Sequence, residues 1–75
     1  MSDRPFDFLK TAIESNVLVR LKDNKDFRGK LKAFDIHMNL VLDDAEDMSN
    51  GGHIKLGRVL LRGDTVVYIS PETVQ

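Results

Sequence analysis

Hydrophobic positions along the chain change from a helical period to a strand period near residue 15. Phe6, Leu9 and Ile13 recur at i, i+3 and i+7, which predicts one amphipathic α-helix over residues 3–14. Asp3 can cap its first turn because a carboxylate accepts hydrogen bonds from free backbone N–H groups. A helix this short is marginal alone, so we expect it to dock on a sheet.

After this helix, hydrophobic and polar residues alternate, and clusters of Asp, Asn and Gly interrupt the alternation. The pattern predicts five short β-strands, at residues 17–22, 27–34, 38–45, 54–61 and 65–70. Gly29 and Gly57 lie inside strands, where glycine often marks a sharp bend or a close backbone approach. We therefore expect a mostly β fold in which the α-helix precedes a strongly bent, five-stranded antiparallel open barrel.

The fourth and fifth predicted strands, residues 54–61 and 65–70, are apolar and lightly charged. Exposed strand edges of this kind aggregate unless they are paired. Pairing with identical neighbours gives a head-to-tail contact that closes into a ring when the rotation allows. The chain has 75 residues and no cysteine, so it is small and has no disulfides to stabilise it. We expect one domain over residues 1–75 that assembles with copies of itself.

Charge is distributed unevenly, although the net charge is only −1. Six Lys and Arg residues lie within positions 20–32, and four acidic residues lie within positions 43–47. The basic stretch fits a solvated β surface and phosphate contacts equally well. The acidic stretch lacks the spacing of an EF-hand loop, and two histidines without cysteine are too few for structural zinc. We expect no metal and no cofactor.

The first residues of the chain do not resemble a signal peptide, because they are charged and contain no apolar core segment. Elsewhere, no apolar run approaches the roughly 20 residues that a membrane span needs. These features predict a soluble, cytoplasmic protein without a membrane partner.

Planar and hydrogen-bonding side chains concentrate in two segments, residues 35–42 and 61–64. His37 and Arg62 carry flat groups that can sandwich a nucleobase, and the Asn39 carboxamide can bond to its edge. The two segments together predict an RNA-binding site.

These same segments carry a resemblance to a known family. Residues 17–43 resemble the first Sm motif through Gly29, Asp35 and the sequence His37-Met38-Asn39 before an apolar strand. Residues 60–69 resemble the second Sm motif, with Arg62-Gly63-Asp64 followed by Val66 to Ile69. A variable loop at about 46–52 separates the motifs. In this form they are most similar to archaeal Sm-like (Lsm) proteins.

The resemblance implies a ring, usually of seven identical subunits, that binds uridine-rich single-stranded RNA at the inner rim of its pore. Such a ring would act as a ribonucleoprotein core or an RNA chaperone in RNA processing. By position, the RNA-binding residues would be His37, Asn39, Arg62 and Gly63. His37 and Arg62 would stack on the base, Asn39 would bond to its edge, and Gly63 would let the backbone approach.

Four further residues have supporting or secondary roles by the same resemblance. Asp35 and Asp64 would hold the loops. Arg4 and Phe34 are candidates for a second RNA contact on the helix side, although packing between strands explains Phe34 equally well.

Other functions fit parts of the sequence. Asp35 and His37 could form a carboxylate–imidazole pair, but no nucleophile stands beside them and no phosphate-binding glycine loop is present. We therefore expect neither an enzyme nor a small-molecule substrate. An oligomeric protein-interaction scaffold, or an RNA-backbone binder without base preference, would share the fold. So would a bacterial Hfq-like hexamer. The Arg-Gly-Asp sequence of the second motif favours the Sm-like heptamer, but sequence does not fix the ring size.

Overall fold

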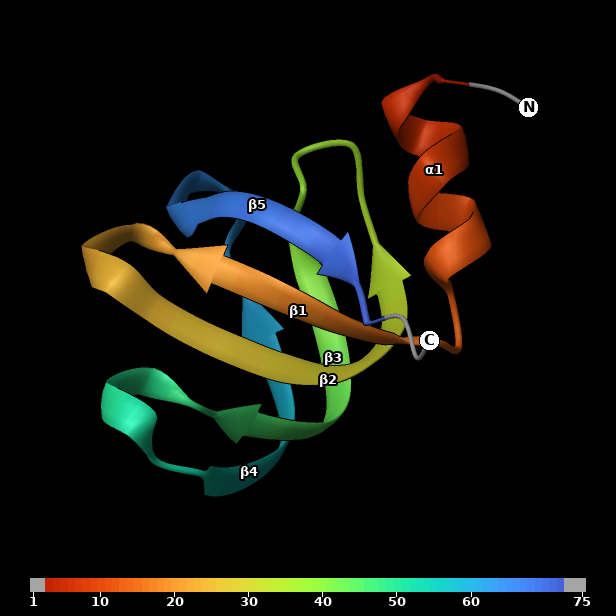
Figure 1. The fold of residues 1–75 in the computed structure, drawn as a ribbon. Coiled ribbons are helices and arrows are strands. Elements are labelled where there is room, and N and C mark those ends of the chain that lie inside the picture. Colours follow the sequence, from red (N-terminus) through yellow and green to blue (C-terminus); the bar gives the residue numbers. More distant parts are fainter. Residues whose placement is uncertain (1–2, 73–75) are drawn as a thin grey trace.

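The computed structural model describes residues 3–72, which form one α-helix and five β-strands (Figure 1). The elements are α1 (Pro5–Ala12), β1 (Asn16–Leu21), β2 (Lys25–Phe34), β3 (Leu40–Asp47), β4 (Ile54–Leu61) and β5 (Val66–Pro71). Short 3-10 turns at Lys22–Asn24, Ser49–Gly51 and Gly63–Thr65 precede β2, β4 and β5. The expected fold class, a helix followed by a bent five-stranded antiparallel sheet, is confirmed.

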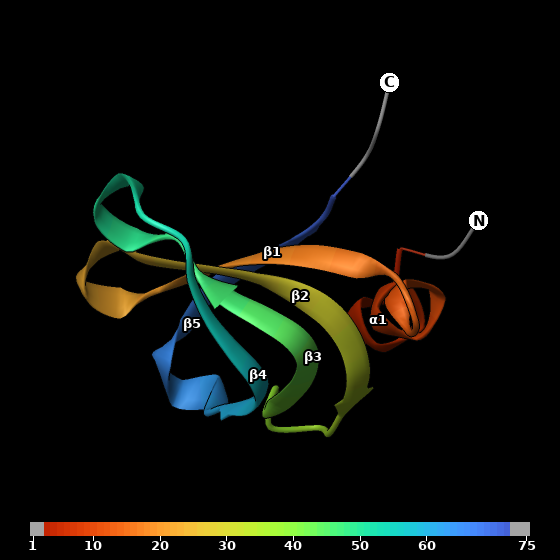
Figure 2. The ribbon, with the colours of Figure 1, turned by 90° about the horizontal axis from the view of Figure 1, so that it is seen from below.

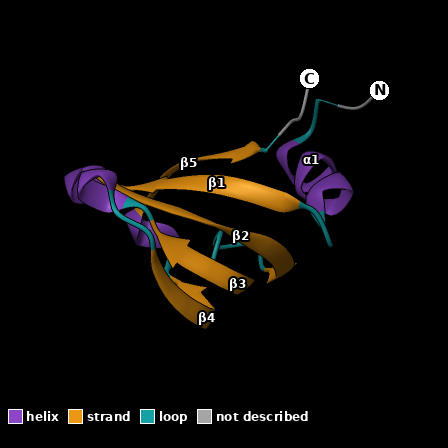
Figure 3. Ribbon diagram, turned by 60° about the horizontal axis from the view of Figure 1, so that its bottom comes forward, coloured by secondary structure: helices purple, strands orange, loops and turns teal. Residues whose placement is uncertain are grey.

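The five strands form one antiparallel sheet in the order β4-β3-β2-β1-β5. Strands β2 and β3 curve strongly along their length, so the sheet wraps around its own inner face (Figure 2). Helix α1 lies at one end of the strands, beside the start of β1 (Figure 3). As expected, β4 and β5 are the two edge strands within the described residues.

Helix α1 is shorter than the expected span of residues 3–14. Arg4 precedes the helix in an extended conformation and Pro5 opens it, so Asp3 does not cap it. The helix ends at Ala12 because Ile13 leaves the helical conformation, with ψ at 136°. Helix α1 has eight residues, and no helix within residues 3–72 is long and apolar enough to cross a membrane.

The core lies on the concave face of the sheet, where alternate strand residues meet. Its largest fully buried side chains are Val17, Val19, Leu31, Leu40 and Leu42. Each contributes about 1.5–3 kcal/mol by leaving water. Alternate residues of β1 and β3 are therefore buried, as expected for strands with one face in the core.

Strand β3 runs from Leu40 to Asp47, two residues later at each end than the predicted strand at 38–45. It therefore includes two acidic residues that the sequence pattern had placed in the variable loop. Glu46 lies opposite Arg28 on β2 and Lys55 on β4. Opposite charges across a strand pair are favourable, so the ladder continues through the acidic stretch.

Half of the six basic residues between positions 20 and 32 are compensated by acidic partners. The ion pairs are Arg20–Asp26, Arg28–Glu72 and Lys32–Glu14. In the acidic stretch, Asp43 binds Arg58 and Glu46 binds His53. This surface is therefore a mosaic of paired charges, which fits the solvated-surface interpretation better than a continuous phosphate track.

Gly29 marks a close approach between β2 and β3. An added Cβ would lie 3.0 Å from the carbonyl oxygen of Asp43 and 3.2 Å from Cβ of Leu42. We expect Gly29→Val to lower the free energy of unfolding by about 1–3 kcal/mol, because the larger side chain pushes the strands apart. Urea denaturation at fixed protein concentration measures this change.

Gly52→Ala is the matched control, because the nearest atom to its added Cβ lies 3.7 Å away. We expect it to change the stability by no more than about 0.5 kcal/mol. Equal urea midpoints for Gly29→Val and the unsubstituted protein would contradict the close approach.

Candidate nucleic-acid interface

Two loops meet at one end of the sheet. Residues 35–39 connect β2 to β3, and residues 62–65 connect β4 to β5. They lie side by side because Leu40, which follows the first loop, pairs with Leu61, which precedes the second. Their side chains line one hollow of about 420 Å³, formed by His37, Asn39, Arg62, Gly63 and Asp64. We call it the two-loop pocket.

Asp35 organises the first loop from its base. Its Oδ1 accepts hydrogen bonds from the backbone N–H groups of His37 (2.9 Å) and Asn39 (3.1 Å). Its Oδ2 accepts a third bond from Nδ2 of Asn39 at 3.0 Å. These bonds hold Met38 at φ +65°, a backbone conformation that side-chain-bearing residues adopt rarely. The loop that carries His37 is therefore fixed by one carboxylate.

Asn39 joins the first loop to the second. Its Oδ1 accepts a hydrogen bond from the backbone N–H of Gly63 at 2.8 Å. Because the Asp35 carboxylate can only accept, the amide nitrogen of Asn39 must face it, and this fixes the orientation of the carboxamide. One N–H and one oxygen lone pair of Asn39 remain for a ligand.

Gly63 lets the two loops touch. An added Cβ there would lie 1.8 Å from the carbonyl oxygen of His37 and 2.8 Å from the carbonyl carbon of Met38. Both neighbours are backbone atoms, so no side-chain movement could make room. The close backbone approach expected at this glycine is thus an approach between the loops.

His37 and Arg62 present their planar groups to solvent. Both are exposed, and Arg62 Nη2 lies 3.3 Å from Asp64 Oδ2. An ion pair this exposed contributes little to stability. Its effect is to restrain the guanidinium beside the pocket while leaving the faces of the group accessible.

Hydrogen bonds to Asp35 lower the pKa of its carboxyl below the ordinary value of 3.8. The side-chain bond from Asn39 contributes most, followed by the backbone N–H of Asn39, and the backbone N–H of His37 adds to them. A lowered pKa means that the folded loop prefers the ionised carboxylate. The bonds therefore stabilise the loop at neutral pH, and this stabilisation is lost as the pH falls through the lowered pKa.

Arg4 and Phe34 do not line the two-loop pocket. Phe34 is half-buried at the end of β2 and meets the ring of Phe6 edge-on, with ring centres 5.0 Å apart. Arg4 is exposed and precedes α1. The aromatic contact gives Phe34 a packing role between sheet and helix. A second RNA contact by Arg4 and Phe34 on the helix side stays a prediction.

Two features of the interface were missed from the sequence. The positive φ of Met38 has no sequence signal, because glycine and asparagine are the residues that usually adopt it. The bond between Asn39 and Gly63 joins positions 24 apart. It could be foreseen only from the strand pairing that brings the loops together.

Comparison with known proteins agrees with this arrangement. Residues 7–71 match the model of the LSM domain. The chain belongs to the LSM domain family. It is 54% identical to an Sm-like protein of Methanosarcina barkeri over 72 residues, which cover 95% of this chain and 100% of the relative. The Sm-like resemblance found in the sequence is therefore confirmed.

Two solved structures show the same fold. One is a heptameric archaeal Sm protein, 42% identical, with a TM-score of 0.87 over 89% of this chain and 98% of the other. The second is the Sm protein of Pyrococcus abyssi in complex with a uridine heptamer, also 42% identical, with a TM-score of 0.89. That match covers 93% of this chain and 100% of the other.

The link between Asp35 and Asn39 can be tested by titration. NMR of the Asp35 carboxyl carbon should give a pKa below 3.8 in the unsubstituted protein. Asn39→Ala should raise this pKa, because the substitution removes the hydrogen bond that lowers it most. An unchanged pKa in Asn39→Ala would contradict the proposed link.

Proposed function

We propose that this LSM-domain chain forms a ring of identical subunits that binds uridine-rich single-stranded RNA in its two-loop pockets. The observation that carries the proposal is the grouping of His37, Asn39 and Arg62 around one hollow, with the Asn39 carboxamide held in one orientation. The complex of the Pyrococcus abyssi Sm protein with a uridine heptamer supports uridine as the base.

The chemistry of the pocket suits uracil. His37 and Arg62 offer flat faces for stacking, which contributes about 1–3 kcal/mol per base and tolerates any base. Selectivity must then come from hydrogen bonds. Uracil presents an N3–H donor between two carbonyl acceptors, which complements the remaining acceptor and donor of Asn39.

The edge strands support assembly into a ring. Large hydrophobic side chains on β4 and β5 remain exposed in the single chain, namely Ile54, Leu56, Leu60, Val67 and Tyr68. Pairing β4 of one subunit with β5 of the next would satisfy both open edges and cover these side chains. The heptameric archaeal Sm structure supports seven subunits.

Ring formation would also strengthen RNA binding. One pocket holds one base weakly, but linked pockets turn each later contact into an intramolecular one and can raise affinity by roughly 10²–10⁴. We propose that the ring serves as a ribonucleoprotein core or RNA chaperone in the cytoplasm. In this proposal the chain binds RNA without cleaving it, and RNA length after incubation with the ring checks that point.

His37→Ala/Arg62→Ala removes both stacking groups and should weaken oligo-U binding by about 10-fold or more. Fluorescence anisotropy with labelled oligo-U measures the change. His53→Ala/Arg58→Ala is the matched control, because it removes the same residue types outside the pocket and should keep nearly full affinity. Unchanged oligo-U binding by the His37/Arg62 variant would reject the pocket, and equal binding of all homopolymers would favour a backbone binder.

Leu56→Asp tests the role of the ring. Leu56 is 45% exposed in the single chain, so the fold tolerates a charge that a neighbouring subunit would have to bury. We expect native mass spectrometry to show dissociation and oligo-U affinity to fall by about 100-fold or more. Ala33→Asp adds the same charge at an exposed position away from the edge strands and should still assemble. Tight oligo-U binding by dissociated Leu56→Asp subunits would refute the avidity argument.

A further inference from the structure

The loop between β3 and β4 contains an Asn-Gly pair, Asn50-Gly51. The pair lies in the 3-10 turn Ser49–Gly51, at the end of the sheet away from α1 (Figure 1). Asn-Gly is a common turn dipeptide because both residues tolerate a positive φ, and here φ is 59° at Asn50 and 75° at Gly51. The pair is also chemically reactive, because the backbone nitrogen that follows an asparagine can attack its carboxamide within the same chain.

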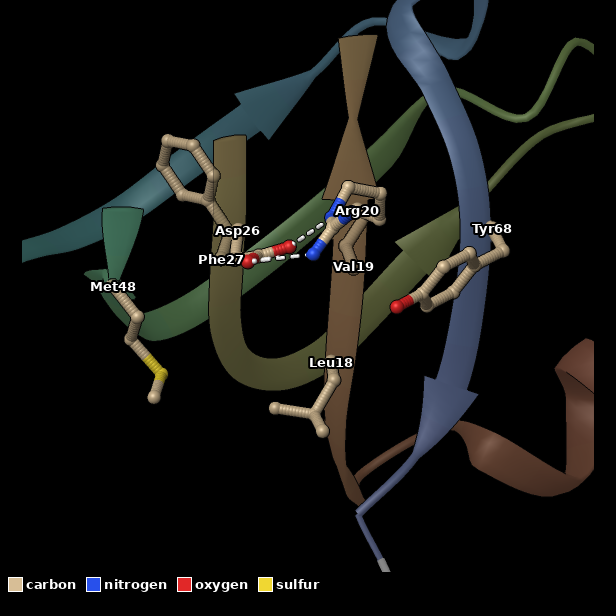
Figure 4. A pocket seen from close by; sticks show the side chains of 7 residues that line it. All are labelled: Leu18, Val19, Arg20, Asp26, Phe27, Met48 and Tyr68. Carbon is tan, nitrogen blue, oxygen red and sulfur yellow. Dashed lines mark hydrogen bonds and ion pairs between the residues drawn. The ribbon is translucent and has the colours of Figure 1, made fainter. Parts of the chain in front are cut away.

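The base of this loop is anchored to the turn between β1 and β2. The backbone N–H of Met48 donates to the carbonyl oxygen of Asp26 at 2.8 Å, and the backbone N–H of Asp26 donates to Oγ of Ser49 at 3.1 Å. In Figure 4, Met48 and Asp26 line the same hollow, and Arg20 holds the Asp26 carboxylate. These bonds hold the base of the loop, and Asn50 lies at its exposed tip.

The surroundings of the loop tip leave room for the attack. Asn50, Gly51 and Gly52 are all exposed, and a Cβ added at Gly51 would meet no atom within 4 Å. The ψ angle of Asn50 is 27°, so the peptide between Asn50 and Gly51 has to rotate before the nitrogen of Gly51 reaches Cγ of Asn50. Glycine permits this rotation at little steric cost because it carries no Cβ.

The other three asparagines of the chain differ from Asn50 in the residue that follows or in their contacts. Asn24 resembles Asn50 in being exposed, in lying in a 3-10 turn and in having the same φ of 59°, but Lys25 follows it. Asn16 begins β1 and precedes a valine, whose branched side chain is stiff. Asn39 has its carboxamide bonded on both sides within the two-loop pocket. Asn50 therefore combines an exposed carboxamide with a following glycine.

We propose that Asn50 is a site of spontaneous covalent modification, at which the asparagine is converted to aspartate and isoaspartate. The nitrogen of Gly51 forms a bond to Cγ of Asn50 and loses its proton. The bond from Cγ to Nδ2 breaks, and Nδ2 leaves with that proton as ammonia. Water then opens the succinimide ring, at Cγ to give aspartate or at the main-chain carbonyl carbon to give isoaspartate. The conversion consumes water and needs no oxidant or reductant.

Conversion adds one negative charge to a chain whose formal net charge is −1. The isoaspartate product also carries a free α-carboxyl group, which isoaspartyl methyltransferases recognise. The loop joins the end of β3 to the start of β4, whereas the two-loop pocket lies at the start of β3 and the end of β4. We therefore expect conversion to mark this loop and to leave oligo-U binding unchanged.

Ageing of the assembled full chain at mildly alkaline pH, followed by peptide mapping, tests the proposal. The peptide that holds Asn50 should gain the mass difference between water and ammonia, about 10-fold or more faster than the peptide that holds Asn24. Isoaspartyl methyltransferase with labelled S-adenosylmethionine should methylate the Asn50 peptide. Asn50→Gln should abolish this labelling, because a glutamine would have to close a larger ring. Asn24→Gln is the matched control and should keep it.

Lys25→Gly places a glycine after Asn24, which already has the φ of Asn50. In this variant Asn24 should convert at a rate within about 3-fold of that of Asn50. Two results would overturn the proposal. One is conversion of Asn50 no faster than that of Asn24 in the unsubstituted chain. The other is an Asn24 that stays as slow in Lys25→Gly as before, because the following glycine would then not be the cause of the reactivity.

Discussion

The carboxamide of Asn39 connects two loops that lie 24 positions apart in the sequence, and the arrangement of the candidate site depends on that connection. Its nitrogen bonds to the carboxylate of Asp35, and its oxygen bonds to the backbone N–H of Gly63. Asp35 in turn holds the backbone that carries His37. Without this chain of bonds, His37 and Arg62 would be two exposed side chains on separate loops.

The sheet makes the connection possible. β3 and β4 pair directly beside the loops, so the end of the first loop and the start of the second are held next to each other. The absence of a side chain at Gly63 then lets the backbones of the two loops touch. The same sheet leaves β4 and β5 unpaired at its edges. One architecture therefore provides both a base-sized pocket and the open edges through which copies of that pocket can be linked. Few side chains of the two-loop pocket face a ligand, so base selectivity depends on where those side chains are held. A large positive net charge on the chain is therefore unnecessary.

Much of this could be predicted from the sequence, because hydrophobic period is a local signal. The change of period separated helix from strands, and the apolar positions of the alternating pattern include Val17, Val19 and Leu42, which are buried in the structure. Features that depend on distant partners could not be predicted in this way. The extension of β3 through Glu46 needs Arg28 and Lys55 on neighbouring strands. The contact between Arg20 and Tyr68 needs β5 to return beside β1, which places Tyr68 opposite a residue 48 positions earlier.

The central claim is that one fixed carboxamide both joins the loops and selects the base. A structure of the assembled chain with a uridine heptamer tests this most directly. The account predicts a uracil ring between His37 and Arg62, with Asn39 bonded to its edge while Asn39 keeps its bonds to Asp35 and Gly63. A uracil bound elsewhere, or an Asn39 side chain that releases Gly63 in order to reach the base, would contradict it.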